Sequence, residues 1–406
     1  MRKLRVLGAL LAVSLCFTLG ISVYEIPEPS WQKTVLDNDT SARFVKAGTA
    51  DGMVHVVYQK SDDEGVTHFS TKTDGSIVHN LGLFINGRSW SFMEVDSDRD
   101  AGTYLSLSDS NDQLKLAYQD ATVGSEEVVY AEYSDSNWTV ETVDSSGRSG
   151  ANVGMYAAVT SFEGQPLVAY HSPRNGLETA LKTEDGWQEY VIGGSSGWFT
   201  SAATCGTQAF ISYSGRNSRQ LNISSFDGEG WTVTQTDLRA DHDTEMVQQG
   251  CKPITAFLNP SGNRIQVLDD DVSTVEISRF AVMGLERNNG YHISFGKYSE
   301  GVYYGYSDDK NNWTLEKIGA NYQSGEHNDV TVDRSDNVHI FYSNATSLVH
   351  AENNSGRVSI ITGFTSGLQN ASLALNLLLA VVFVSVGYRE DFFHLFKSFM
   401  IEEIEE

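Results

Sequence analysis

The sequence lacks any long amphipathic helical pattern between Trp31 and Thr362, which argues against a helical domain in this region. Glycine and aromatic residues are frequent instead, with 36 glycines and 11% aromatic residues in the 406-residue chain. This composition suits many short strands joined by tight turns. We therefore expect one large all-β domain rather than two average domains.

Basic residues are also scarce. The chain has 28 Lys and Arg against 53 Asp and Glu, which gives a net charge of −25. A nucleic-acid-binding surface needs clustered Lys and Arg to release counterions, and here they are scattered. The composition therefore excludes a nucleic-acid partner. The acidity indicates either solubility in a salty exterior or a surface that holds cations.

Motifs for hydrolytic or phosphate chemistry are absent as well. The chain has no nucleophile-elbow serine, no phosphate-binding loop and no zinc-protease motif. Only three cysteines occur, and Cys16 follows Leu15, which is too large for a typical lipoprotein cleavage site. The sequence therefore assigns no catalytic residue.

What the chain does contain is a repeat. Seven short apolar runs each end in an aromatic residue, spaced roughly 40 to 60 residues apart. Strand-like units at this period predict a propeller or an array. The runs are Val54–Tyr58, Leu114–Tyr118, Leu167–Tyr170, Ala209–Tyr213, Ile254–Phe257, His292–Phe295 and Val338–Tyr342.

Each unit divides into four strands, most clearly in the third. Its strands are expected at Met155–Thr160, Leu167–Tyr170, Leu177–Lys182 and Trp187–Ile192. Four antiparallel strands make one propeller blade, and seven blades close a ring. The blades pack on both faces, so their inner strands should be continuous apolar runs, as the aromatic-ended strands are. We predict a seven-bladed β-propeller of four-stranded antiparallel blades.

Two segments are candidates for the last strand of the ring. Trp31–Leu36 looks like a fourth strand with no blade before it, and Val358–Thr362 looks like the fourth strand of the last blade. We expect Trp31–Leu36 to close the ring by pairing into the seventh blade, because closure removes open sheet edges.

The turn before the fourth strand recurs as Asp135–Trp138, Asp185–Trp187, Asp227–Trp231 and Asp309–Trp313. These turns resemble the Asp-box turns of sialidase-like propellers. Trp138–Gly147 followed by Pro166–Tyr170 also resembles a widespread class of extracellular propeller repeats. The resemblance covers Trp31–Thr362 and implies the propeller fold, without a single activity.

For an enzyme, the resemblance implies a sialidase-like glycosidase. That family uses an arginine cluster for the substrate carboxylate, a Tyr–Glu nucleophile pair and an Asp acid. Its early Arg-Ile-Pro signature is absent here, and no Tyr–Glu pair can be assigned. Arginines in suitable loops are Arg88, Arg148, Arg174, Arg216, Arg239 and Arg287.

The two remaining cysteines fall at matching places in neighbouring units. Cys205 and Cys251 each lie just before a second strand, and equivalent turns of adjacent blades are close. An oxidising exterior permits a bond there. We predict a Cys205–Cys251 disulfide that joins blades four and five, with two buried free thiols as the alternative.

The two ends have membrane-like patterns. Residues 1–24 combine a basic start with an uncharged apolar run, as in a signal peptide or signal anchor, and residues 371–388 read as a transmembrane helix. The basic start places the N-terminus in the cytoplasm, so the propeller, residues 31–362, is expected outside the cell. Residues 389–406 form a cytoplasmic amphipathic tail, either a helix on the inner membrane surface or a continuation of the span.

An outside domain also permits glycosylation. Six sequons lie before the predicted span, apart from the one at Asn370 that abuts it. Their asparagines are Asn38, Asn137, Asn222, Asn312, Asn344 and Asn353.

Ligands of propellers usually bind on the face that carries the loops between blades and the loops after second strands. Candidate ligand contacts on this face are Trp90, His171, Arg174, Trp198, Phe199, Arg216, His242 and His327. Aromatic side chains stack on sugars, but they also fill gaps between blades. Carboxylates flank His242 and His327, which suits either a transition metal or polar loop tips.

The longest inter-blade connection contains Asp96, Asp98 and Asp100 at alternate positions. Such carboxylates converge on a hard cation, so calcium is the candidate metal, with a solvated acidic turn as the alternative. No other cofactor is expected to be required.

These observations favour a membrane-anchored extracellular propeller. We expect it to bind a glycan or a protein at the inter-blade loop face, or to act as a scaffold. The alternatives are a sialidase-like surface glycoside hydrolase and a structural subunit of a cell-envelope complex.

Overall fold

The computed structural model describes residues 31–353, apart from gaps at 39–41, 61–64, 73–77, 81–82, 86–89, 97–99, 146–151, 194–195, 242, 262, 278–282, 298–299, 320–323 and 345. The chain divides into two compact units. One is Trp31–Asn353, and the other is formed by residues 1–30 and 354–406. The predicted signal or anchor, the predicted span at 371–388 and the tail lie in that second unit, outside the described residues. In the described part, no helix is long and apolar enough to cross a membrane.

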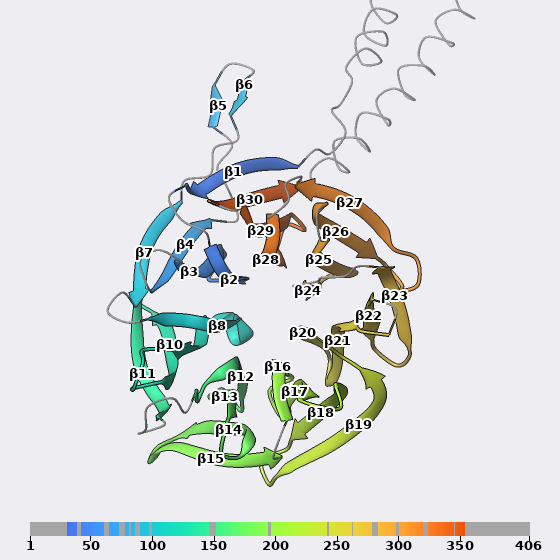
Figure 1. The fold of residues 1–406 in the computed structure, drawn as a ribbon. Coiled ribbons are helices and arrows are strands. Elements are labelled where there is room, and N and C mark those ends of the chain that lie inside the picture. The colour runs from blue at the N-terminus through green and yellow to red at the C-terminus, as the bar shows by residue number, and fades with distance from the viewer. Residues whose placement is uncertain are drawn as a thin grey trace, which may run out of the picture. The chain divides into compact units, whose positions relative to one another are not determined.

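The described residues form seven four-stranded antiparallel sheets arranged as a ring (Figure 1). Blade 1 comprises β2 (Ala42–Ala50), β3 (Met53–Lys60), β4 (Val66–Lys72) and β7 (Ser91–Asp96), and blade 2 comprises β8 (Ala101–Ser108), β9 (Lys115–Asp120), β10 (Glu127–Ser134) and β11 (Asn137–Ser145). Blade 3 comprises β12 (Met155–Phe162), β13 (Gln165–Ser172), β14 (Gly176–Thr183) and β15 (Gly186–Gly193), and blade 4 comprises β16 (Ser196–Thr204), β17 (Ala209–Gly215), β18 (Gln220–Phe226) and β19 (Trp231–Arg239).

The other three blades complete the ring. Blade 5 comprises β20 (Thr244–Gln249), β21 (Lys252–Asn259), β22 (Arg264–Leu268) and β23 (Val272–Ile277), and blade 6 comprises β24 (Met283–Arg287), β25 (Tyr291–Lys297), β26 (Gly301–Ser307) and β27 (Thr314–Gly319). Blade 7 comprises β28 (Ser324–Val332), β29 (Val338–Asn344), β30 (Leu348–Asn353) and β1 (Gln32–Asp37). The short strands β5 (Val78–Asn80) and β6 (Leu83–Ile85) pair with each other, and Ser110–Asp112 form a 3₁₀ turn. The seven-bladed all-β prediction is confirmed.

The aromatic-ended runs are the second strands of the blades and lie in the core. In β9, every residue from Lys115 to Asp120 is buried, and Tyr58, Tyr118 and Tyr170 are fully buried. Apolar clusters extend from one blade to the next, as where Val57 of blade 1 packs with Leu116 of blade 2. Burial on both faces therefore explains why these runs do not alternate between apolar and polar residues.

The first strand of the chain closes the ring. β1 pairs antiparallel with β30, with Gln32 opposite Glu352 and Val35 opposite Val349. The expectation that Trp31–Leu36 pairs into blade 7 is confirmed, while Val358–Thr362 lie outside the described residues. Tyr58 of blade 1 donates a hydrogen bond from its hydroxyl to Asp37 at the end of β1. The closing strand is thus linked to both blades at the junction.

A similar tyrosine–aspartate link occurs at the following junction. The Tyr118 hydroxyl donates to Asp96 at the end of β7 at 2.9 Å. In blade 3, burial and the nearby Asp144 carboxylate raise the pKa of Tyr170 above its usual value. An aspartate at the end of a fourth strand therefore accepts a hydrogen bond from the second-strand tyrosine of the next blade at two successive junctions, and Asp144 lies near Tyr170 at the third.

We predict that the Tyr58–Asp37 hydrogen bond stabilises ring closure. Tyr58→Phe and Asp37→Ala should each lower the free energy of unfolding by about 1–2 kcal/mol, because each removes the hydrogen bond between the two side chains. The double variant should lose less than the sum of the two, as measured by urea denaturation of all four proteins. Tyr342→Phe is the matched control. Tyr342 is the corresponding second-strand tyrosine of blade 7, and burial alone raises its pKa, with no contribution from a carboxylate. Strict additivity would contradict the link.

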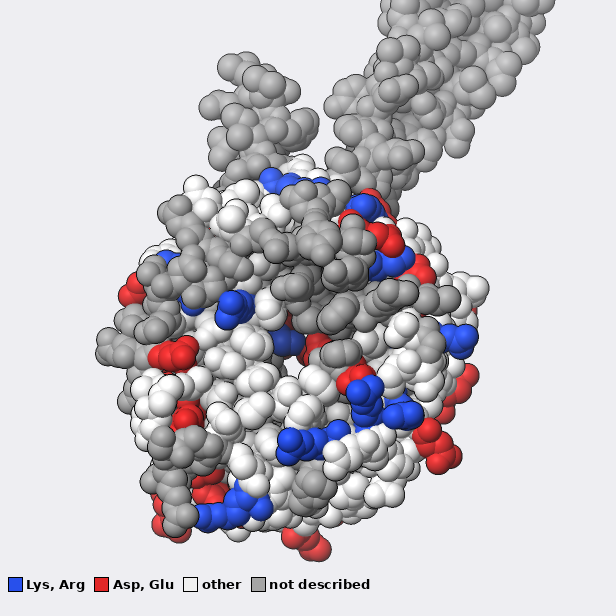
Figure 2. Space-filling model, in the orientation of Figure 1, with Lys and Arg blue, Asp and Glu red and all other residues white. Residues whose placement is uncertain are grey.

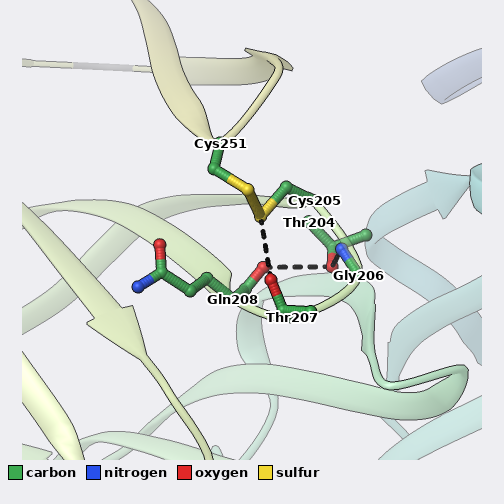
Figure 3. The surroundings of a disulfide bond; sticks show 6 residues. All are labelled: Thr204, Cys205, Gly206, Thr207, Gln208 and Cys251. Atoms are coloured by element: carbon green, nitrogen blue, oxygen red, sulfur yellow. Dashed lines mark hydrogen bonds between the residues drawn. A yellow bond between two sulfur atoms is a disulfide. The ribbon is translucent and has the colours of Figure 1, made fainter.

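A disulfide joins blades 4 and 5. Cys205 follows β16, Cys251 lies between β20 and β21, and their Cα atoms are 5.1 Å apart (Figure 3). The turn around Cys205 is fixed locally, because the Cys205 backbone amide donates to the carbonyl oxygen of Gln208 at 3.0 Å. The predicted pairing is confirmed, and the free-thiol alternative is wrong.

Removal of this disulfide should destabilise the propeller. The bond closes a sequence separation of 46 residues, for which loop-closure entropy gives about 4 kcal/mol. Reductant should therefore shift the urea midpoint of the wild type downward. A Cys205→Ser, Cys251→Ser double variant serves as the control, because its lower midpoint should not respond to reductant. A wild-type midpoint that reductant leaves unchanged would refute the prediction.

Candidate functional site

The innermost strands of the blades surround a central channel and share one register. In each blade, the innermost strand pairs with the second strand, which carries the aromatic-ended run. We define the floor position as the residue of the innermost strand that pairs with the next-to-last residue of this run. We define the rim position as the residue two places earlier. The floor residues of blades 1 to 7 are Lys46, Ser106, Ala158, Ser201, Glu245, Gly284 and Asp329, and the described rim residues are Phe44, Tyr104, Tyr156, Phe199, Asp243 and His327.

In blades 1 to 4, a β-bulge places an aromatic residue at the rim position. The pairing register shifts there, for example between Thr103 and Ser106 in blade 2. All four aromatic rim residues have positive φ angles, from 47° at Phe44 to 55° at Tyr156. A left-handed conformation costs a residue with a side chain roughly 1–2 kcal/mol. The bulge re-aims the side chain at the channel mouth, as bulges next to binding sites do.

These aromatic residues form a continuous arc around the mouth. Ring centroids are 5.4 Å apart for Phe44 and Tyr104, 4.6 Å for Tyr104 and Tyr156, and 4.9 Å for Tyr156 and Phe199. At the other end, His327 of blade 7 lies 5.1 Å from Phe44. We call these five residues the aromatic arc. It extends through blades 7, 1, 2, 3 and 4, and its spacings are those of favourable aromatic pairs.

The arc continues outward beside blade 4. Trp198 lies 5.5 Å from Tyr156, and the Arg216 guanidinium lies over the Trp198 ring at 5.4 Å. A cation over an indole face is attracted by the ring quadrupole. Trp198 and Arg216 therefore form an aromatic and cationic edge next to the mouth.

The arc lines a mouth cavity of about 230 Å³, together with Asp243 and Glu245. A second cavity of about 280 Å³ occupies the channel below it. Lys46, Ser106, Ser201 and Glu245 line both cavities. The centre of the ring is hollowed, with acidic and basic side chains beside the hollow (Figure 2). The site thus has an aromatic wall above a polar floor.

An ion pair spans the floor from blade 1 to blade 5. Lys46 Nζ lies 2.6 Å from Glu245 Oε2, and both side chains are 18% exposed. Burial alone lowers the pKa of Lys46, but nearby carboxylates, led by Glu245 and Asp329, raise it above its usual value. Lys46 is therefore a charged donor at neutral pH.

Asp329 completes the floor on the blade 7 side. Its carboxylate accepts hydrogen bonds from the backbone amides of Ala47 at 2.8 Å and Val330 at 2.9 Å, and burial raises its pKa. Gly284 holds the neighbouring floor position, where a Cβ atom would overlap Asp329. The glycine of blade 6 therefore makes room for the aspartate of blade 7.

His327 is a neutral member of the arc at pH 7. Burial, together with the nearby positive charges of Arg43 and Lys46, lowers the pKa of His327 to about 4. Its uncharged ring can pack on Phe44 in the same way as the other aromatic side chains. The arc therefore presents a largely uncharged wall.

The structure brings together half of the predicted ligand contacts. Phe199 and His327 line the mouth cavity, and Trp198 and Arg216 adjoin it. His171 lies at the end of β13, and Arg174 is exposed in the turn that follows; neither lines the cavity. His242 lies outside the described residues.

Trp90 is placed elsewhere. Its ring centroid lies 5.8 Å from Phe341 and 5.0 Å from His350, both in blade 7. Trp90 precedes β7 of blade 1, so it fills the gap between the first and last blades instead of facing the mouth.

The predicted calcium ligands lie apart from the mouth. Asp96 accepts the hydrogen bond from Tyr118, Asp100 is exposed before β8, and Asp98 lies outside the described residues. Calcium binding at these residues stays a prediction.

The sequons differ in exposure. Asn38, Asn137 and Asn312 are exposed, Asn344 is half-buried, and Asn222 and Asn353 are buried. The Asn222 amide also donates to the Gln220 carbonyl oxygen at 3.0 Å. Use of the six sequons stays a prediction.

Most residues of the site were not predicted from the sequence, because they lie on inner strands and the predicted ligand contacts were placed in loops. Phe44, Tyr104, Tyr156, Lys46 and Glu245 all lie on inner strands. A signal for the aromatic residues is nevertheless present in four first strands. Their sequences R-F-V-K, T-Y-L-S, M-Y-A-A and W-F-T-S carry an aromatic residue two places before the floor position.

Comparisons with known proteins concern the fold. No family model and no curated protein sequence matches the chain. The structure is similar to the SapL1 lectin in complex with alpha methyl fucoside, at 11% identity and a TM-score of 0.49, covering 70% of this chain and 98% of the lectin. It is similar to a fucose-specific lectin from Aleuria aurantia at 11% identity and a TM-score of 0.46, covering 70% and 98%. Trypanosoma rangeli sialidase is similar at 10% identity and a TM-score of 0.44, covering 78% of this chain and 55% of the sialidase.

We predict that His327 makes the propeller sensitive to acid. An unfolded histidine titrates near pH 6.5, whereas His327 titrates near 4 in the fold. Between these values the unfolded chain binds more protons, so stability is lost as the pH falls through this window. His327→Phe keeps an aromatic ring and removes the titration, and should make the loss smaller by up to about 3 kcal/mol. Urea denaturation from pH 7 to 4 measures this, and parallel curves for the two proteins would refute it.

Proposed function

We propose that this chain is a carbohydrate-binding propeller and that its site is the channel mouth. The observation that carries the proposal is the aromatic arc above the Lys46–Glu245 floor. A sugar ring has an apolar C–H face and a rim of hydroxyl groups. The arc offers rings for the apolar face, and the floor offers hydrogen-bond donors and acceptors for the hydroxyls.

The size of the mouth limits the buried part of the ligand. Its volume of about 230 Å³ lies just below the roughly 300–1,000 Å³ of typical ligand pockets. A single sugar unit fits this volume, with the rest of a glycan extending outward past Trp198 and Arg216. Lys46 can donate a hydrogen bond to one sugar hydroxyl while Glu245 accepts a hydrogen bond from an adjacent hydroxyl. Charge-assisted hydrogen bonds of this kind are strong.

Binding without hydrolysis suits the residues at the mouth. A sialidase-like reaction needs converging arginines, and no arginine lines the mouth cavity among the described residues. Arg216 lies beside Trp198, Arg174 and Arg239 are exposed, and Arg88 and Arg148 lie outside the described residues. We therefore do not propose a glycoside hydrolase.

The surface gives little support for a structural subunit. The exposed large apolar side chains of the described residues each come from a different strand or turn. They are Val35, Phe92, Val123, Val140, Val191 and Val233.

We further propose that the propeller is displayed outside the cell and anchored in the membrane. The support comes from the sequence, where a basic start with an apolar run precedes the propeller and an uncharged run at 371–388 follows it. In this arrangement the mouth meets extracellular glycans.

A glycan array with three variants tests the binding proposal. Tyr156→Ala removes the centre of the arc and should weaken binding to the best array ligand at least tenfold, equivalent to about 1.4 kcal/mol. Tyr156→Phe retains the ring and should bind nearly as the wild type does. Phe92→Ala is the matched control, because Phe92 is an exposed ring on the outer strand of blade 1 and is 53% exposed.

The glycan array is run once with calcium and once with a chelator. An empty array for the folded wild type under both conditions would overturn the proposal. Equal losses for Tyr156→Ala and Phe92→Ala would overturn the placement of the site at the mouth.

A further inference from the structure

We propose that blade 7 contains a binding site for one divalent transition-metal ion, formed by His339, His350 and Glu352. His339 lies on β29, and the other two lie on the neighbouring strand β30. His339 is paired with Glu352, and Phe341, two residues further on, is paired with His350. The two strands therefore bring two imidazoles and one carboxylate to a single point.

The geometry suits an ion shared by the three side chains. His339 Nδ1 lies 3.0 Å from His350 Nε2, and one ligand atom from each of the three residues falls within 4.8 Å of the others. Two nitrogens that each bind an ion at roughly 2.0–2.1 Å are themselves about 3 Å apart at angles between right-angled and tetrahedral. The exposed fractions are 0%, 2% and 7%, so solvent is largely excluded.

A buried carboxylate behind His339 orients that ring. Asp333 Oδ2 lies 3.2 Å from His339 Nε2. Asp333 is itself fixed by the backbone amides of Ser335 at 2.8 Å and Asn337 at 3.0 Å, and by the Asn337 side chain at 2.8 Å. A metal-binding histidine commonly donates its other N–H to such a carboxylate, which fixes the tautomer and leaves the opposite nitrogen for the ion.

Blade 1 contains a histidine pair at the same strand positions, with no carboxylate of the described residues hydrogen-bonded to either ring, and serves as an internal comparison. His55 Nδ1 lies 2.9 Å from His68 Nε2, and the residue paired with His55 is Ser70 where blade 7 has Glu352. The carbonyl oxygen of Ala50 faces His55 Nε2 at 3.1 Å, and the Trp138 indole faces His68 Nδ1 at 3.2 Å.

The difference between the two blades points to an ion. In blade 1 every ring nitrogen has an uncharged partner, so the pair is complete as a neutral hydrogen-bonded relay. In blade 7 two carboxylates, Asp333 and Glu352, occur at the same buried pair. A divalent ion between the two histidines would place positive charge beside both carboxylates.

The ligand set favours Zn²⁺ among divalent ions. Two imidazole nitrogens with one carboxylate oxygen suit zinc and its first-row neighbours, whereas magnesium and calcium prefer oxygen ligands alone. Both imidazoles would bind the ion as neutral rings. Because β30 pairs with the closing strand β1, an ion on this strand would reinforce ring closure.

Zinc titration of the chelator-treated full chain tests the site. The wild type should bind one Zn²⁺ per chain by calorimetry, and its melting temperature should rise with Zn²⁺. Glu352→Gln should bind at least tenfold more weakly. Ser70→Ala, at the matching position of blade 1, should bind as the wild type does.

A measurement that needs no variant supplements the titration. Co²⁺ added to the wild type should give the visible absorption bands of a nitrogen- and oxygen-ligated ion, and excess Zn²⁺ should remove them. Folded wild-type protein that binds neither ion would overturn the proposal, as would undiminished zinc binding by Glu352→Gln. Neither result bears on glycan binding at the channel mouth, so this site and the proposed function fail independently.

Discussion

The pairing of β1 with β30 is the constraint on which the rest of the structure depends. It joins residues 32–37 to residues 348–353, the two ends of the described chain. The aromatic arc passes through the same junction, because His327 of blade 7 contacts Phe44 of blade 1. The hydrogen bond that the Ala47 backbone amide donates to the Asp329 carboxylate also connects blades 1 and 7 at this junction. Without ring closure, neither the arc nor the polar floor would be continuous, so the stability of the ring and the shape of the site cannot be separated.

A second constraint arises at the channel itself. The innermost strands have one edge without a neighbouring strand, and backbone N–H groups on that edge need partners. Side chains of adjacent inner strands supply some of them: Asp109 accepts from the Thr49 amide, Ser106 from Val159 and Ser201 from Met246. These bonds explain why short polar residues line the channel. They also hold the floor in place for the Lys46–Glu245 ion pair.

The parts that were predictable from the sequence are those that burial determines in every blade. The second strands were recognisable because both faces are covered, and the Cys205–Cys251 pairing followed because equivalent turns of neighbouring blades lie close together. The mouth was not predictable in the same way, because it depends on a β-bulge, which shifts the register of only part of a strand. Trp90 shows the reverse case. An aromatic residue in a long connection looked like a ligand contact, yet packing against His350 determines its position.

Comparison of equivalent positions shows how one repeated unit becomes an asymmetric site. At the rim position, blades 1 to 4 carry aromatic residues, whereas blade 5 carries Asp243. At the floor position, Lys46 faces Glu245 across the channel, while Ser106 and Ser201 stay neutral. The repeat therefore preserves the strands and varies the residues that point into the channel. One side of the mouth therefore carries aromatic rings and the other carries polar and charged side chains. The same logic distinguishes the histidine pair of blade 7 from that of blade 1, where an identical framework carries Ser70 in place of Glu352.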